Sequence, residues 1–362
     1  MKGRVKNIYR NLKKDVDVVV LANSTEPHID ATFFYVTGVT TGLFEGCAAF
    51  LHDDGGMDLV LSQLEEETAK TAGLQYSTFM TRRQLLRQLR KNLYGHRRIG
   101  VNAEEITHQY VTRLQKLAPK ARLIDVSDAV RAARLVKDEE EQRRVAKACK
   151  IVSGAFVDLL PMIKKGRRED DLAAELVHLM QKRGASNQSF ETIVGSGPNS
   201  AEAHYTAGSR RLRKGDLVVF DFGARYEKYV SDITRTVVVG KASERQKRMH
   251  AVVRSAQKKA MAMMKKGAKG ASIDKAARGY IDSTEFKGRF VHSLGHSIGL
   301  SVHDGAGFGP NSKVVAKPGM IFTNEPGVYI SGYGGVRVED DVLITAKGPK
   351  VLTTAPRELI EV

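Results

Sequence analysis

The chain has 362 residues, of which 42% are apolar and 27% are charged, and its formal net charge is +17. This length and composition predict two globular domains and exclude a disordered or disulfide-stapled chain. The only cysteines, Cys47 and Cys149, lie far apart in the sequence, as expected of free thiols in a reducing compartment. The sequence contains no run of roughly 18 apolar residues, the length needed to span a membrane, so we expect a cytoplasmic protein.

The first third of the sequence alternates between helix and strand patterns. The basic segment at the N-terminus predicts a helix, because the apolar stretch after it is too short and too charged for a signal peptide. Strands are predicted at 15–22, 46–51 and 97–102, and helices at 65–73 and 82–95. The alternation indicates a small α/β domain, residues 1–127.

A second domain, predicted for residues 135–362, shows the same order of elements twice. It begins near Asp138 with a long helix that carries acidic residues in its first turn. Helices are predicted at 138–164, 168–183, 242–266 and 272–284, and β-hairpins at 216–240 and 320–345. Each pair of helices is thus followed by an irregular stretch and a hairpin. We therefore expect an α/β (α+β) chain whose second domain has two similar halves around one antiparallel sheet.

The densest basic stretch, Lys241–Lys269, contains ten lysines and arginines and a single acid, Glu244. Apolar residues recur in it at helical spacing: Met249, Val252, Val253, Ala256, Ala260 and Met263. This pattern predicts an amphipathic helix with a solvated basic face. No zinc-finger, RNA-recognition or helix-turn-helix motif accompanies it, so we do not expect a nucleic-acid partner.

The first predicted hairpin, "FDFGARYEKYVSDITRT" (220–236), carries two aspartates in strand-like surroundings. If its turn lies between Tyr226 and Glu227, Asp221 and Asp232 face each other directly, with Cβ atoms about 5 Å apart. Two like charges that close must share a proton or bind a cation.

The second hairpin carries two glutamates, Glu325 and Glu339, on either side of a glycine-rich turn. Three histidines lie between the hairpins and one precedes the first: His292, His296, His303 and His204. Four carboxylates with an imidazole suit a pair of divalent ions such as Mn²⁺, Co²⁺, Zn²⁺ or Fe²⁺. Such a pair activates water to hydrolyse a stable acyl or phosphoryl bond.

These residues resemble those of the pita-bread metallopeptidases: aminopeptidase P, Xaa-Pro dipeptidase (prolidase) and, more distantly, methionine aminopeptidase. The matching stretches are "HYTAG" (204–208), "VVFDFGARYEKYVSDITRT" (218–236), "HSLGHSIGLSVHD" (292–304), "FTNEPGVYI" (322–330) and "GVRVEDDVLIT" (335–345). The resemblance covers the second domain. More weakly, "FFYVTG" (33–38) is similar to the family's creatinase-like N-terminal domain, although Thr32 stands where many relatives have asparagine.

The resemblance implies two divalent metal ions, with Mn²⁺ or Co²⁺ expected before Zn²⁺ or Fe²⁺. Asp221 would bind one ion through both oxygens, and Asp232 and Glu339 would bridge both ions. His296 and Glu325 would complete the sphere of the other. A hydroxide that bridges the ions would then attack the scissile carbonyl.

Catalytic roles are also implied by the resemblance. Glu325 would act as general base and then as general acid. His204 and His303 would stabilise the tetrahedral oxyanion or the leaving nitrogen. His292 would orient the substrate or support the site.

Three further residues would have supporting roles. Arg337 would sit near Asp232 and hold that bridging carboxylate in place. Asp340 and Asp341, which follow Glu339, are expected to be structural.

The implied substrate is a peptide with proline in second position, because methionine aminopeptidases lack the N-terminal domain and the histidines match the proline-specific pattern. That branch of the family implies a homodimer in which the partner's N-terminal domain helps to close the site. Dipeptidases tend to carry an arginine between the VHD and EPG motifs for the substrate's free carboxylate. The corresponding loop, 305–317, has no arginine and only Lys313 as a central cation. This favours an aminopeptidase slightly and leaves a dipeptidase open.

The main alternative is a non-catalytic pita-bread protein that binds peptides or nucleic acid, which the charge of +17 would suit. All five expected metal ligands are present, which argues against it. A creatinase is disfavoured for the same reason, because creatinases lack the metal set.

Overall fold

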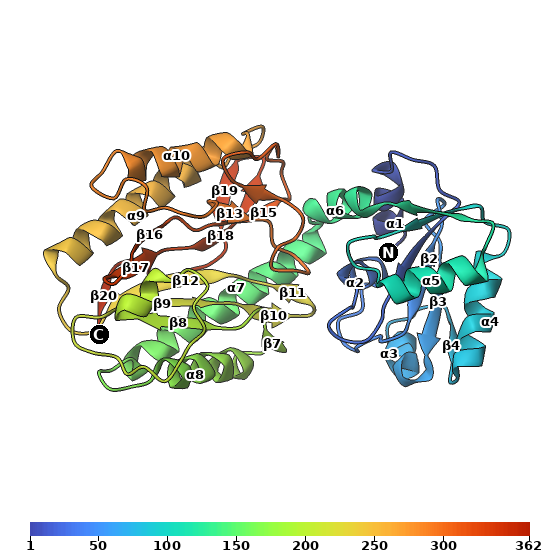
Figure 1. Ribbon diagram of the computed structural model, residues 1–362, viewed down its shortest axis with the longest axis horizontal. Coiled ribbons are helices and arrows are strands. Elements are labelled where there is room, and N and C mark those ends of the chain that lie inside the picture. The colour runs from blue at the N-terminus through green and yellow to red at the C-terminus, as the bar shows by residue number, and fades with distance from the viewer. The chain divides into compact units, whose positions relative to one another are not determined.

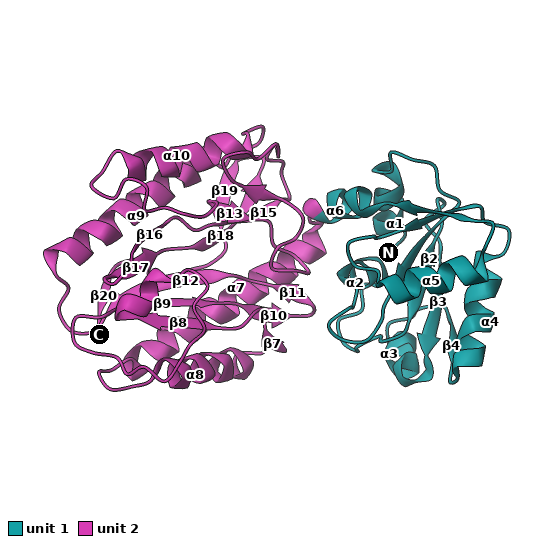
Figure 2. Ribbon diagram, in the orientation of Figure 1, with its two compact units in different colours: residues 1–134 teal, residues 135–362 magenta.

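The computed structural model describes all 362 residues, which form two compact units, Met1–Arg134 and Leu135–Val362 (Figures 1 and 2). The first unit extends beyond residue 127, where the sequence placed its end, because α6 (Ser127–Leu135) packs on it. Tyr35 Oη and Asn7 Nδ2 donate hydrogen bonds to Ala133 O, at 3.0 and 2.9 Å. No helix in either unit combines the length and the apolar composition needed to cross a membrane.

The first unit is built on a six-stranded mixed sheet in the order β4-β3-β2-β1-β5-β6 (Figure 1). Its strands are β1 (Val18–Ala22), β2 (Ala48–Leu51), β3 (Met57–Ser62), β4 (Tyr76–Phe79), β5 (Arg98–Val101) and β6 (Arg122–Asp125). Besides α6, its helices are α1 (Lys2–Arg10), α2 (Ala31–Thr37), α3 (Glu66–Thr71), α4 (Arg82–Leu93) and α5 (His108–Leu117). The sequence predicted β1, β2, β5, α1, α3 and α4, and did not assign the others.

Four long helices flank the strands of the second unit: α7 (Glu139–Leu159), α8 (Glu169–Lys182), α9 (Glu244–Met263) and α10 (Gly270–Asp282). Asp138 caps α7 by accepting a hydrogen bond from Glu141 N, so the predicted start is confirmed. Helices α7 and α8 share one apolar core with strands of the first hairpin, and α9 and α10 share another with strands of the second. The predicted repeat of two helices and a hairpin is therefore confirmed.

The strands of this unit do not form the single antiparallel sheet that the sequence predicted. They fall into several small sheets: β20-β12-β9-β8, β11-β10-β7, β15-β18-β19, β16-β17 and β13-β14. The bounds are β7 (Asn187–Gln188), β8 (Ile193–Ser196), β9 (Leu217–Phe222), β10 (Ala224–Tyr226), β11 (Tyr229–Val230), β12 (Ile233–Val238), β13 (Gly295–His296), β14 (Gly307–Phe308), β15 (Ile321–Asn324), β16 (Gly327–Ile330), β17 (Gly334–Arg337), β18 (Asp340–Thr345), β19 (Gly348–Val351) and β20 (Ile360–Glu361).

The two hairpins nevertheless lie side by side, because polar groups join them across the gap between sheets (Figure 1). Glu339 N donates to Thr234 O at 3.1 Å, and Thr236 Oγ1 donates to Arg337 O at 2.9 Å. These bonds bring the carboxylate-bearing ends of both hairpins to one place.

Helix α9 is the predicted basic amphipathic helix. Met249, Val253, Ala256 and Ala260 are fully buried, as the spacing predicts. Met263, which the same pattern placed on the buried face, is 43% exposed, and Met264 is buried in that core instead.

Candidate metal centre

Asp221 and Asp232 come from the first hairpin, in a register that differs from the predicted one. The turn residues are Glu227 and Lys228, with φ angles of 48° and 71°, so the turn lies one residue later than expected. Asp221 therefore pairs with Thr234, and its predicted direct pairing with Asp232 is wrong. A turn moved by one residue shifts the register by two, which keeps each side chain on its face. The two aspartates are diagonal neighbours on the same face.

Glu325 and Glu339 come from the second hairpin, where the direct pairing does occur. Strand β15 pairs with β18, and β16 pairs with β17, in one continuous register. Glu325 lies between β15 and β16, and Glu339 lies between β17 and β18. The continued register places these two glutamates opposite each other.

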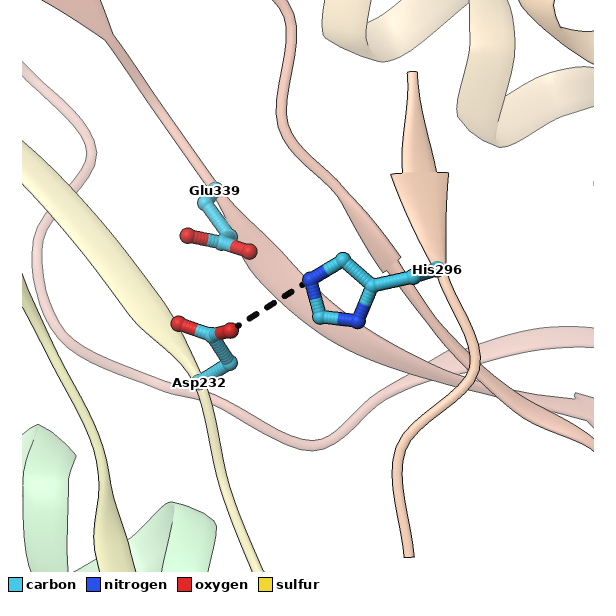
Figure 3. Close-up of side chains that lie close together, drawn as sticks. All are labelled: Asp232, His296 and Glu339. Atoms are coloured by element: carbon cyan, nitrogen blue, oxygen red, sulfur yellow. Dashed lines mark ion pairs between the residues drawn. The ribbon is translucent and has the colours of Figure 1, made fainter. Parts of the chain in front are cut away.

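Asp232, His296 and Glu339 form a compact cluster (Figure 3). One ligand atom from each lies within 4.8 Å of the others. His296 Nε2 is 3.6 Å from Asp232 Oδ2 and 3.4 Å from Glu325 Oε1. The imidazole edge and the carboxylates thus face one shared space, which is large enough for a cation between them.

The carboxylate oxygens of this cluster and of the neighbouring Asp221 have the chemistry of a cation site. Asp221 Oδ1, Asp232 Oδ1 and Glu339 Oε1 are buried and accept no hydrogen bond from the protein. A buried carboxylate oxygen without a donor is costly, and nearby carboxylates add repulsion. Divalent cations are the ordinary partners of such oxygens. The residues present therefore fit bound divalent metal ions.

The same burial shifts the pKa values of the cluster in the metal-free protein. Burial raises the pKa values of Asp232 and Glu339 well above their ordinary range, and the neighbouring carboxylates raise them further. Burial also raises the pKa of Glu325 to about 8. Burial lowers the pKa of His296 to about 4, and the charge of His303 contributes. The imidazole is consequently neutral at pH 7, as a metal ligand must be.

Arg337 is fully buried but contacts a different aspartate from the predicted one. Its Nη2 donates a hydrogen bond to Asp221 Oδ2, and no salt bridge joins it to Asp232. The predicted partner is therefore wrong. The reason is the side-by-side packing of β12 and β17, which directs the guanidinium to the strand that bears Asp221.

Arg337 still supports a predicted bridging carboxylate, through a threonine. Arg337 Nε donates to Thr234 Oγ1 at 2.9 Å, and Thr234 Oγ1 donates to Glu339 Oε2 at 2.6 Å. Thr234 was not singled out from the sequence, although it stands in the matched stretch "SDITRT". It fixes one oxygen of Glu339 and leaves the other for a metal ion.

His292 lies beside Glu325 and is held by Tyr329, another residue that sequence reasoning missed. His292 Nδ1 is 2.8 Å from Ser293 O and 4.0 Å from Glu325 Oε2. Since a carbonyl only accepts, Nδ1 carries the proton, and Nε2 accepts from Tyr329 Oη at 2.8 Å. Burial lowers the pKa of His292 to about 3, which keeps this neutral form.

The two outer histidines also reach the cluster. The rings of His303 and His296 have centroids 4.1 Å apart. Removal from bulk water lowers the pKa of His303, and the charge of His204 lowers it further. His204 also contributes to the lowered pKa of His292. All four predicted histidines therefore gather at one site, although His204 lies about 90 residues from the rest.

Asp340 and Asp341 support the site from behind. Asp341 Oδ2 accepts hydrogen bonds from Asp232 N at 2.9 Å and from Cys149 Sγ at 3.2 Å. Asp340 forms a buried ion pair with Arg235 at 2.8 Å. Both contacts join the two hairpins, which is the structural role expected of these aspartates.

The family assignment follows from comparison with known proteins. Residues 143–346, which contain every residue of this cluster, match the model of Metallopeptidase family M24. The chain belongs to that family. Residues 4–136 match the Creatinase/Prolidase N-terminal domain. As an M24 metallopeptidase, the protein is a hydrolase that uses divalent metal ions, and the resemblance to pita-bread enzymes is confirmed.

M24 relatives cover the whole chain. The Xaa-Pro dipeptidase of Pyrococcus horikoshii is 35% identical over 99% of both chains. Among solved structures, the Xaa-Pro dipeptidase from Bacillus anthracis has a TM-score of 0.91, with 31% identity and 99% coverage of both chains. The X-Pro aminopeptidase from Thermotoga maritima has a TM-score of 0.90, with 31% identity over 98% of this chain and 99% of its own. The predicted two-part fold is therefore confirmed.

Proposed function

We propose that the protein hydrolyses the bond between the N-terminal residue of a peptide and a following proline. Two divalent ions, Mn²⁺ or Co²⁺, would be held by five residues: Asp221, Asp232, His296, Glu325 and Glu339. The observation that carries the proposal is the buried group of Asp232, His296 and Glu339, in which both carboxylates keep one oxygen without a hydrogen-bond donor. The relatives support the substrate class, since dipeptidases and an aminopeptidase for Xaa-Pro bonds are among them.

When bound, such ions supply Lewis acidity and make water a strong nucleophile near neutral pH. Glu325 is placed to move the proton. Its Oε1 accepts a hydrogen bond from Thr323 Oγ1 at 3.0 Å, which leaves Oε2 to take a proton and pass it to the proline nitrogen.

The outer histidines would stabilise charge that develops in the transition state. His204 and His303 are both exposed toward solvent, where an incoming peptide can reach them. A neutral imidazole donates one N–H bond, which can serve the oxyanion or the leaving nitrogen. Tyr329 fixes the ring of His292 next to Glu325, so His292 would orient the substrate.

The decisive experiment is a matched set of peptides offered to protein loaded with Mn²⁺, Co²⁺, Zn²⁺ or Fe²⁺ in turn. The set contains an Xaa-Pro dipeptide, an Xaa-Pro tripeptide and the tripeptide with alanine in place of proline. We expect release of the first residue from both proline peptides and not from the control. The tripeptide should be cleaved at least as fast, because the 305–317 loop lacks an arginine for a free carboxylate. If no loaded form cleaves either proline peptide, the proposal fails and a peptide-binding module replaces it.

We also propose a homodimer, which the resemblance to the proline-specific branch supports. Sedimentation equilibrium should give twice the 39.9 kDa mass of the chain. A monomer at micromolar concentration would contradict it.

His303→Ala should lower kcat by about 100-fold or more while leaving the metal content unchanged, because it removes a transition-state donor but no ligand. Peptide kinetics and elemental analysis of the same preparation measure the two effects. His178→Ala, an exposed histidine on α8, is the control and should behave as wild type. Loss of metal from the His303 variant would place His303 among the ligands instead.

A further inference from the structure

Glu169, the first residue of α8, is a buried carboxylate outside the metal cluster. Its exposed fraction is zero. It accepts hydrogen bonds from Ser196 N at 2.7 Å, Ser196 Oγ at 2.6 Å, Asn199 Nδ2 at 3.1 Å and Tyr205 Oη at 2.9 Å. A carboxylate this buried is stable only because its donors replace water. Every donor comes from the segment 196–205.

That segment carries His204 and has little regular structure of its own. It consists of a short 3₁₀ turn, Gly197–Ala201, and then a stretch without helix or strand that runs to residue 210. The backbone of α8 holds the far end of the stretch: Glu169 N donates to Arg210 O at 3.1 Å, and Asp170 N donates to Gly208 O at 3.0 Å. Side-chain and backbone groups at the start of one helix therefore hold both ends of the stretch.

Tyr205 connects this anchor to the residue beside it, His204. Its hydroxyl accepts a hydrogen bond from Asn199 Nδ2 at 2.7 Å and donates one to Glu169 Oε2. Burial raises the pKa of Tyr205 to about 12, and the bond to Glu169 raises it too, so the hydroxyl remains a donor at neutral pH. The ring of His204, by contrast, makes no hydrogen bond within the chain. No side-chain hydrogen bond fixes it, so its position depends on the backbone next to Tyr205.

We propose that Glu169 and Tyr205 are positioning residues, which hold the 202–210 stretch so that His204 faces the reacting peptide. This inference rests on the proposed function for its kinetic consequence. Neither residue lies among the proposed metal ligands, so the metal content is expected to be independent of both. Preorganised donors act mainly on the transition state, so the effect should appear in kcat and leave KM nearly unchanged.

The test removes one oxygen atom. Tyr205→Phe removes both hydrogen bonds of the hydroxyl and should lower kcat by about tenfold, with KM and metal content unchanged. In a His204→Ala background the same substitution should have no further effect, because Tyr205 acts through His204. Tyr226→Phe is the matched control, since Tyr226 is also a partly buried tyrosine beside a glutamate, Glu227, but lies in the first hairpin.

Hydrogen exchange of the amides of residues 202–210 provides a readout that needs no activity. Exchange should be faster in Tyr205→Phe than in wild type and unchanged in Tyr226→Phe. Additive losses of kcat in the double variant, or unchanged exchange in the stretch, would overturn the positioning role. A wild-type protein that cleaves no proline peptide would instead overturn the proposed function, and the exchange result would still decide whether Tyr205 holds the stretch.

Discussion

Asp232→Ala is expected to abolish cleavage of Xaa-Pro peptides and to remove at least one of two bound metal ions. Asp232 is 4% exposed, and its carboxylate lies within 4.8 Å of ligand atoms of both His296 and Glu339. Alanine leaves no oxygen that could take its place as a bridge. Because the ions supply the chemistry of the step, losing a bridge should cost several orders of magnitude in kcat/KM. Peptide release and elemental analysis after dialysis measure the two losses.

The same substitution should have the opposite effect on stability in the metal-free protein. Burial and the neighbouring carboxylates disfavour the charge of Asp232, so its removal relieves that repulsion. Without metal and at pH 8, Asp232→Ala should therefore melt above wild type; with metal it should melt below. Asp158→Ala, an aspartate paired with Arg183 on the surface, should change neither. Normal turnover and two metal ions in Asp232→Ala would show that the bridging assignment is wrong.

Much of this site could be predicted from the sequence because its signals are local. Asp138 caps α7 three residues before Glu141, and that pattern needs no tertiary contact to be recognised. Likewise, the alternation of side chains along a strand put Asp221 and Asp232 on one face. The predicted turn was wrong by one residue, which shifted the strand register by two positions. A shift by two keeps both side chains on the same face of the sheet. An odd shift would have separated the aspartates and broken the site.

Contacts between the two hairpins could not be predicted in this way. The position of the turn depended on Glu227 and Lys228 adopting positive φ angles, which neither residue type signals. The partner of Arg337 depended on how β12 lies against β17, and no pattern within either hairpin states that alignment. The short helix α2 of the first unit was not predicted either. Its aromatic and β-branched residues have low helix propensity, although Asp30 caps its start and the left-handed Gly38 marks its end.

The metal-free protein should lose stability as the pH rises from 7 to 8. Burial raises the pKa values of Glu325 and Asp341 to about 8, and raises those of Asp232 and Glu339 well above their ordinary range. A raised carboxyl pKa means that the folded state holds more protons than the unfolded state. The stabilising contribution of each such carboxyl group to the free energy of unfolding is therefore lost as the pH rises toward its folded pKa. The loss is about 1.4 kcal/mol per pH unit for each extra proton.

The buried histidines have the opposite effect on stability, because they destabilise the folded protein as the pH falls, and they do so at lower pH. Burial depresses the pKa values of His292 and His296 to about 3 and about 4, so their contribution is lost as the pH falls below the unfolded value of roughly 6.5. Between pH 7 and 8 these histidines are neutral in the folded state and mostly neutral in the unfolded state, so the carboxyl groups dominate the response. The chosen window thus reports mainly on the buried carboxyl groups.

Metal ions should reverse this dependence, because binding requires the carboxylates to be ionised and releases their protons. Thermal unfolding of protein treated with a chelator, and of protein with excess Mn²⁺, should be followed in parallel at pH 7.0, 7.5 and 8.0. We expect the melting temperature of the chelated protein to fall across the series and the difference between the two samples to widen. A chelated protein whose stability is constant or rises over this range would mean that the carboxyl groups are already ionised without metal. Some other positive charge would then offset the repulsion among the carboxylates of the metal-free cluster.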